Sequence, residues 1–165
     1  MKKIIALCLA LLLMASMLTG CFGTKEYSCQ DLTMSVPFGM KDVSSKSDFS
    51  DFTFALDSSK IAIFGLREKF SDFDGLDGQN LELKEYANLL IKANKNISGT
   101  PLPSTRSNHD YVYFIYEAKT NDGLYKYLTG CYKGEDAFWM VQIAAKVTDF
   151  ELETFLDYLD SVKIG

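Results

Sequence analysis

The sequence is poor in the side chains on which most catalytic and metal sites depend. Its 165 residues include one histidine, His109, four cysteines and three prolines. A histidine-assisted nucleophile would have to use His109, but this residue lies in a polar run before a predicted strand, where a solvated loop histidine is the simpler interpretation. A zinc site would need carboxylates in place of the missing histidines, and no glycine-rich loop follows a strand to bind phosphate. We therefore expect neither an enzyme nor a protein that holds a metal ion or cofactor.

Positive charge is scarce as well. The chain has 17 basic and 22 acidic residues, and loss of the first twenty residues, which contain Lys2 and Lys3, leaves 15 against 22, a net charge of −7. Phosphate binding needs clustered lysine and arginine side chains. The composition therefore excludes nucleic acid as a partner, and it gives the domain no electrostatic attraction to anionic lipid headgroups.

The first 21 residues have the pattern of a bacterial export signal. Lys2 and Lys3 precede an apolar run from Ile4 to about Leu18, shorter than the ~20 residues of a membrane-spanning helix. The run ends in Leu-Thr-Gly-Cys at positions 18–21, which resembles the lipobox of bacterial lipoproteins. The resemblance implies cleavage before Cys21 and acylation, as with palmitate, of its thiol. An ordinary secretory signal followed by a chance cysteine is the alternative.

Lipid on Cys21 would place the protein on the extracytoplasmic face of a cell membrane. Because each buried CH₂ contributes about 0.8 kcal/mol, the two or three acyl chains of a lipoprotein cysteine give stable attachment. Residues 1–20 are then the signal peptide, 21–26 a short tether, and 27–165 a single domain. An extended tether of this length keeps the domain within roughly 20 Å of the bilayer.

Two cysteines remain for the folded domain. Cys8 leaves with the signal and Cys21 carries the lipid, so Cys29 and Cys131 form an even pair in an oxidising compartment. Such pairs commonly form disulfides, and we predict a disulfide bond between these two. The alternative is a pair of buried thiols that pack as small apolar residues, and the spacing does not decide between them.

The hydrophobic pattern predicts six main strands and two helices. Alternating apolar and polar residues predict strands near 32–37, 52–56, 61–66, 111–118, 124–132 and 137–145. Amphipathic stripes predict one helix over about 81–97, capped by Asn80, and a second that begins at a capping box over 148–151. Residues 41–51 and 99–110 are predicted loops, and 161–164 a short edge strand. The order predicts an α+β domain with two main helices packed against an antiparallel sheet of about six strands.

Four segments within this order resemble a known family. The domain resembles the PsbP-like fold in a first strand ending in Val36-Pro37, a middle helix with Glu85-Tyr86, a meander over 123–127 and a last helix running into 161–164. The resemblance spans residues 27–165 and implies the α+β architecture. The family includes extrinsic photosystem subunits and many bacterial lipoproteins, and it shares a fold far more than a site. It therefore implies no functional residues for this chain.

One acidic segment offers oxygen ligands for calcium. Asp72, Asp74, Asp77 and Asn80 lie within nine residues, and hard cations bind several such oxygens. The spacing does not fit an EF-hand, since Asp77 falls at the glycine position and Leu83 at the glutamate position. A solvated turn before the helix is favoured, and calcium binding to the loop stays open.

Tyrosine is concentrated on one predicted hairpin. Six of the nine tyrosines fall between Tyr111 and Tyr132. With a two-residue turn, Tyr116 shares one sheet face with Tyr125 and Tyr127. The other face mixes aromatic and charged residues. Sheet packing is the commoner role of such aromatics, but exposed tyrosines also make rigid, amphipathic contact surfaces. We predict that the less apolar face, around Tyr111, Tyr113 and Lys126, is a binding surface.

These observations predict a non-catalytic binding module at the cell envelope. Its expected contacts are the membrane, through the lipid on Cys21, and an unknown envelope protein or ligand. An accessory or assembly subunit of a membrane protein complex is the alternative, and an envelope enzyme is the least favoured.

Overall fold

The computed structural model describes residues 23–165, apart from 57–60, 74, 95–96, 98, 105 and 107–109. Cys21 and His109, which the sequence singles out, therefore lie outside the described residues. Within the described part, neither helix has the length and apolar character needed to cross a membrane.

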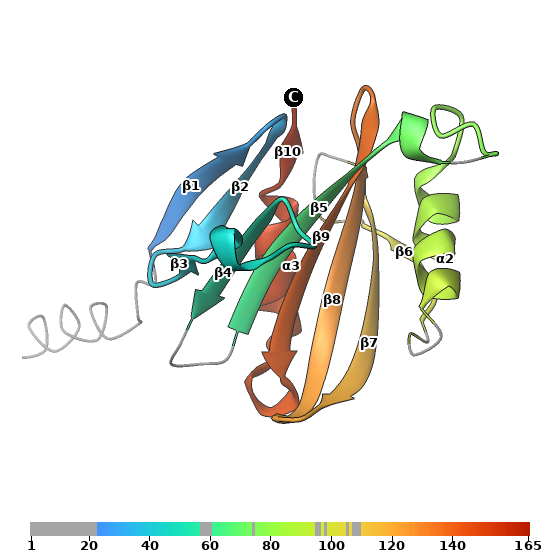
Figure 1. The fold of residues 1–165 in the computed structure, drawn as a ribbon. Helices are drawn as coiled ribbons and strands as arrows, with labels where there is room; N and C mark the ends of the chain where they lie inside the picture. Colours follow the sequence, from blue (N-terminus) through green and yellow to red (C-terminus); the bar gives the residue numbers. More distant parts are fainter. Residues whose placement is uncertain are drawn as a thin grey trace, which may run out of the picture.

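The strands form two antiparallel sheets instead of the single predicted sheet (Figure 1). The smaller sheet has the order β1-β2-β10, with β1 at Thr24–Cys29, β2 at Leu32–Pro37 and β10 at Lys163–Ile164. The larger has the order β3-β4-β5-β9-β8-β7-β6, with strands at Lys41–Asp42, Phe52–Leu56, Ile61–Lys69, Ala137–Lys146, Gly123–Lys133, Val112–Thr120 and Leu102–Pro103 respectively. The helices are α2, Leu83–Ala93, and α3, Leu152–Asp160, and three short 3₁₀ turns lie at Ser44–Lys46, Phe70–Asp72 and Val147–Asp149. The α+β class is confirmed.

Turn chemistry sets the register of the central hairpin. Thr120 pairs with Gly123, so the turn between β7 and β8 has two residues, and Gly123 has a φ of 130° that suits a residue without Cβ. This register pairs Tyr116 with Tyr127 and Val112 with Cys131. The grouping expected for a two-residue turn is confirmed.

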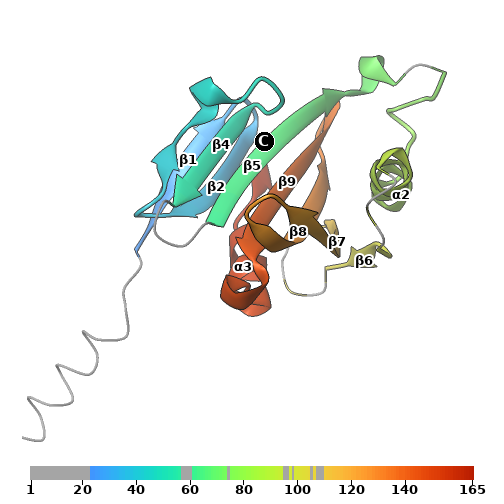
Figure 2. The same ribbon diagram turned by 60° about the horizontal axis from the view of Figure 1, so that its bottom comes forward.

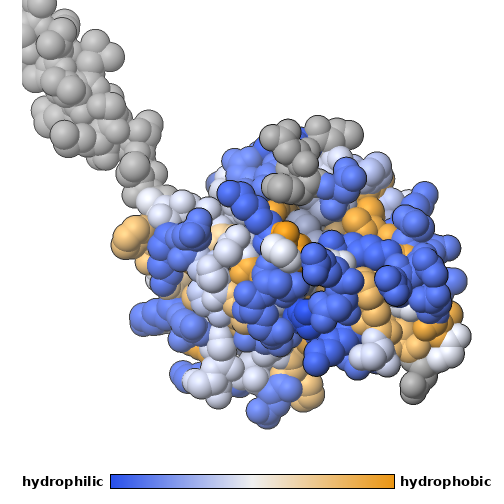
Figure 3. Space-filling model, turned by 90° about the horizontal axis from the view of Figure 1, so that it is seen from above, coloured by the Kyte–Doolittle hydropathy of each residue, from blue (hydrophilic) through white to orange (hydrophobic). Residues whose placement is uncertain are grey.

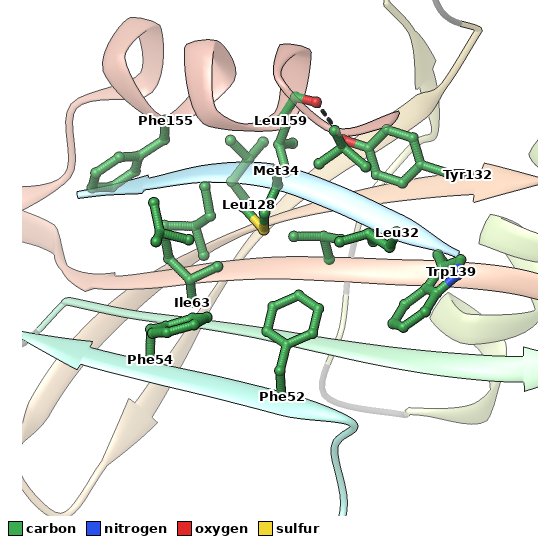
Figure 4. Packing of buried hydrophobic residues seen from close by; sticks show 14 of the residues in the cluster. Leu32, Met34, Phe52, Phe54, Ile63, Leu128, Tyr132, Trp139, Phe155 and Leu159 are labelled. Carbon is green, nitrogen blue, oxygen red and sulfur yellow. Dashed lines mark hydrogen bonds between the residues drawn. The ribbon is translucent and has the colours of Figure 1, made fainter. Parts of the chain in front are cut away.

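A large core fills the space between the two sheets. Its buried side chains come from both sheets and from α3, and they include Leu32, Met34, Phe52, Phe54, Ile63, Leu128, Trp139 and Leu159 (Figure 4). The Tyr132 hydroxyl donates to the Leu159 carbonyl at 2.8 Å, which ties the end of α3 to β8. We call this cluster the main core.

A second core lies on the other side of the larger sheet. It contains Tyr86 and Ala87 of α2 together with Val112, Phe114, Cys131 and Phe138 of the sheet. Because side chains alternate along a strand, β7, β8 and β9 supply both cores. Helices α3 and α2 therefore lie on opposite sides of the larger sheet (Figure 2). We call the second cluster the α2 core.

Several local predictions differ from the structure. The predicted loops at 41–51 and 99–110 contain the short strands β3 and β6. Strand β1 begins at Thr24, inside the predicted tether, because Thr24–Cys29 pairs along its whole length with β2 although only its alternate residues are partly buried. Helix α2 begins after Glu82, not Asn80, and Glu82 and Glu85 cap each other's backbone amides. The predicted capping box at 148–151 falls largely in a 3₁₀ turn, and α3 begins after Glu151.

Candidate binding groove

The predicted binding surface around Tyr111 is wrong, because that face of the hairpin packs against the main core and α3. Tyr111 is only 2% exposed, stacks on Tyr132 with ring centroids 5.1 Å apart, and donates its hydroxyl to Asp160 of α3 at 2.7 Å. Burial raises the pKa of Tyr111, so the hydroxyl stays a neutral donor. Tyr113 is half-buried against the same core.

The third residue of that predicted surface, Lys126, is also occupied within the domain. Its Nζ lies 3.1 Å from Glu117 Oε1 and 5.3 Å from the ring centre of Phe150. The ammonium group thus has a carboxylate partner across the hairpin and an aromatic ring beneath it. Tyr111, Tyr113 and Lys126 do not form an open contact surface.

The predicted disulfide is also wrong, because Cys29 and Cys131 are free thiols. Cys29 packs against the main core, whereas Cys131 is fully buried in the α2 core. The larger sheet separates the two environments, so the side chains do not meet. Burial raises the pKa of both thiols. They are the packed thiols of the alternative interpretation.

The acidic segment before α2 forms local turns. The Asn80 side-chain amide donates to Asp77 Oδ2 at 2.6 Å, and the Ser71 hydroxyl donates to Asp72 Oδ1 at 3.2 Å. Asp74 lies outside the described residues. Among the residues that the structure places, no group of three or more His, Cys, Asp and Glu side chains could hold a metal ion.

Helix α2 is fixed to the sheet at its first turns. Tyr86 stacks on Phe138 with centroids 4.3 Å apart and planes 10° apart, and Phe73 meets both rings edge-on. Burial raises the pKa of Tyr86, and its neutral hydroxyl donates to the Glu68 carboxylate. Lys133 Nζ also donates to the carbonyls of Gln79 and Leu81 at 2.7 and 2.8 Å, which holds the segment leading into the helix.

The later turns of α2 leave a groove of about 470 Å³ above the sheet. Its helical wall and floor are formed by Leu90, Ala93, Asn94, Ile97, Phe114, Tyr116, Met140 and Gln142. None of these described lining residues carries a charge, so the groove suits a neutral ligand or an uncharged segment of a partner. We call this feature the α2 groove.

A ladder of aromatic rings continues the floor of the groove along the sheet. Tyr116 lies between Phe114, at 6.2 Å, and Tyr127, at 4.8 Å with planes only 5° apart. Tyr125 follows at 6.5 Å from Tyr127. The three tyrosines are half-buried, so each shows part of a ring or its edge to solvent. Such surfaces bind flat or amphipathic groups at small cost in side-chain entropy.

A buried polar pair lies beside the ladder. Gln142 Nε2 donates to the Thr129 hydroxyl at 2.6 Å, and the Tyr116 hydroxyl lies 3.4 Å from Gln142 Oε1. Burial raises the pKa of Tyr116, which keeps the phenol protonated. The floor therefore combines aromatic surface with the half-buried Tyr116 hydroxyl, while the Gln142 amide beneath it is bonded within the domain.

No family model and no curated protein matches the sequence. Among solved structures, cyanobacterial PsbP (CyanoP) from Synechocystis sp. PCC 6803 aligns with a TM-score of 0.58 and 13% identity over 88% of this chain and 95% of that one. The fold is PsbP-like.

A second solved structure aligns with most of this chain. A protein from Bacteroides thetaiotaomicron VPI-5482 aligns with a TM-score of 0.53 and 9% identity over 82% of this chain. The match covers 45% of that protein, so this chain spans about half of its length. At these identities the likeness establishes the fold alone.

Proposed function

We propose that the protein is a membrane-anchored extracytoplasmic lipoprotein whose PsbP-like domain binds a ligand or partner at the cell envelope without catalysing a reaction. The anchor is supported by the lipobox-like sequence that ends at Cys21. Binding is supported by one structural observation, the uncharged α2 groove with its ladder of stacked aromatic rings. Anchoring adds to binding, because confinement at a surface raises the local concentration of partners and makes weak contacts sufficient.

The anchor is tested by metabolic labelling with a fatty acid. The wild-type protein should take up the label, and Cys21→Ser should lose it and accumulate as precursor or soluble protein. Cys8→Ser is the matched control, because it removes a cysteine from the predicted signal without changing the acylated residue. A Cys21→Ser protein that is processed normally and stays on the membrane would contradict the proposal.

Binding at the α2 groove is tested by photocrosslinking in native membranes. A photoreactive phenylalanine analogue at Tyr127, which stacks on Tyr116, should give a discrete adduct with an envelope component. Ala93→Trp should abolish that adduct, because Ala93 is an exposed residue that lines the groove and an indole there would fill it.

The control for the filled groove is Lys84→Trp. Lys84 is also exposed on α2 but does not line the groove, so this variant should keep the adduct, and both variants should melt close to the wild-type temperature. An adduct unaffected by Ala93→Trp would place binding elsewhere. Saturable turnover of an envelope substrate would replace the binding proposal with an enzymatic one.

A further inference from the structure

Exposed apolar side chains gather at the end of the domain where the described chain begins. Phe38, Leu124 and Val147 are 67%, 47% and 38% exposed. Thr24 pairs with Pro37 just before Phe38 in the smaller sheet, and Tyr125 pairs with Lys146 just before Val147 in the larger sheet. A hollow lined by Pro37, Met40 and Thr148 lies between these two places. We call this surface the tether end.

Phe38 is held outward by the fold. It lies in a turn closed by a hydrogen bond from Met40 N to the Pro37 carbonyl at 3.0 Å. Its own amide donates to the Gly23 carbonyl at 2.8 Å, and a Cβ on Gly23 would lie 3.3 Å from the Phe38 ring. The ring is therefore beside the first described residue, two positions after Cys21, a span of at most ~7 Å.

A hollow joins the two apolar parts of the tether end. It has a volume of about 560 Å³ and is lined from one side by Pro37 and Met40, which flank Phe38's turn, and from the other by Thr148, which follows Val147. Leu56 and Ile61 lie on its walls. Asp149 and Glu151 also line the hollow, so it links the β2–β3 turn to the end of β9 through a mixed surface of apolar and polar side chains.

The charges around the tether end are mixed. Lys119 pairs with Leu124 across the hairpin, and Lys146 precedes Val147. Asp122 lies two residues before Leu124, and Asp149 lies two residues after Val147. Electrostatic attraction to anionic headgroups therefore contributes little here, and burial of apolar side chains is the favourable term. Lysine stems beside such side chains extend naturally toward the headgroups.

We propose that the tether end rests on the bilayer that carries the anchor, with the Phe38 ring inserted at the boundary between headgroups and acyl chains. This inference rests on the proposed attachment through Cys21. It accounts for the exposure of Phe38, Leu124 and Val147, whereas Phe49, Leu76 and Leu102 are exposed outside the tether end. The opposite end, seen from above in Figure 3, is covered mostly by hydrophilic side chains.

The orientation is tested with tryptophan reporters in full-length, lipidated protein. Phe38→Trp places an indole at the tether end. Phe49→Trp is the matched control, because Phe49 is 87% exposed and lies near the far end of β1. It comes two positions before Asp51, whose carboxylate accepts a hydrogen bond from Gln30, the residue after β1. Trp139 is fully buried and gives the same background in both proteins. The proteins are reconstituted in phosphatidylcholine vesicles with and without phosphatidylcholine brominated on its acyl chains.

We expect the added emission of Phe38→Trp to shift to shorter wavelength and to fall at least twofold with brominated lipid, and that of Phe49→Trp to stay nearly constant. Equal quenching of both reporters, or of neither, in anchored protein would overturn the orientation while leaving the anchor intact. The same reporters in a Cys21→Ser background separate the two proposals. If no lipidated protein forms, the proposed anchor is wrong. Selective quenching of Phe38→Trp on added vesicles would then still support the orientation, and no selective quenching would overturn it.

Discussion

Phe138 is the residue on which the attachment of α2 to the sheet depends most, and we predict the consequence of removing it. Its side chain is fully buried, stacks on Tyr86, and meets the edges of Phe70 and Phe73 at centroid distances of 5.0 and 5.8 Å. Truncation of a buried phenylalanine to alanine costs about 3–5 kcal/mol. Each lost aromatic pair contributes about 0.5–1.5 kcal/mol beyond burial, so we expect a value in the upper half of that range for Phe138→Ala.

The loss should be concentrated on the α2 side of the sheet. The aromatic partners of Phe138 come from α2 and the segment before it, whereas the main core has its own set of side chains. A small domain has a stability of about 5–15 kcal/mol, so the variant should fold but open more readily around α2. The groove formed by the later turns of α2 would open with it.

Urea unfolding of the Cys21→Ser protein, followed by circular dichroism, measures the free energy, and native-state hydrogen exchange locates the loss. Phe49→Ala is the matched control, because the same truncation at an 87% exposed residue should change stability by less than about 0.5 kcal/mol. Phe138→Ala should speed exchange in α2 far more than in α3. A cost below about 1 kcal/mol, or equal acceleration in both helices, would refute the division into two cores.

Two further predictions concern buried titratable groups. Cys131 has no exposed surface and a pKa raised by burial, so it should resist iodoacetamide at neutral pH in the native protein. In urea without reductant, both Cys131 and Cys29 should react as free thiols. Peptides crosslinked through these two cysteines in an unreduced digest would contradict this. Burial by itself would raise the pKa of Asp31, but hydrogen bonds from Trp139 Nε1 at 2.9 Å and Arg67 Nε at 3.0 Å outweigh it, so the pKa is lowered on folding. The stabilisation is therefore present above the unfolded pKa of about 3.9 and lost as pH falls through the folded value. Asp31→Asn should flatten the fall of the urea midpoint between about pH 5 and pH 2, and an unchanged slope would show that Asp31 is not coupled to folding.

Local signals in the sequence were strong enough to predict most of the elements. Alternation of apolar and polar residues gave β4 at Phe52–Leu56, and Asn121 and Asp122 before Gly123 gave the two-residue turn. Both features act within a few residues of one another. Strand β1 is not predicted, because Thr24–Cys29 contains few apolar residues. Its stability comes from pairing with β2, and the sequence of one segment alone does not indicate such a pairing.

The choice between the two faces of the hairpin depended on contacts that lie far apart in sequence. Alternation placed Tyr111 and Lys126 on one face, and the charged residues near the turn made that face look solvated. Tyr111, at the other end of the strand, is covered by α3 and hydrogen-bonded to Asp160, 49 residues away. The same limit applies to Cys29 and Cys131, because alternation does not tell which side of the larger sheet a thiol occupies.

The two sides of the larger sheet are closed to different degrees, and this difference favours the α2 side for binding. On the α3 side, Arg106 forms ion pairs with Glu153 and Asp157, at 2.5 Å each, and with Asp160 at 3.3 Å. Exposed ion pairs each contribute little to stability, but these three link Arg106 to three positions along α3. On the α2 side the stacked rings hold the first turns, while Leu90 and Ile91 of the later turns are only partly buried against the α2 core, beside the half-buried Tyr116. A ligand in the α2 groove would contact the rings of the ladder and the Tyr116 hydroxyl without displacing a packed helix.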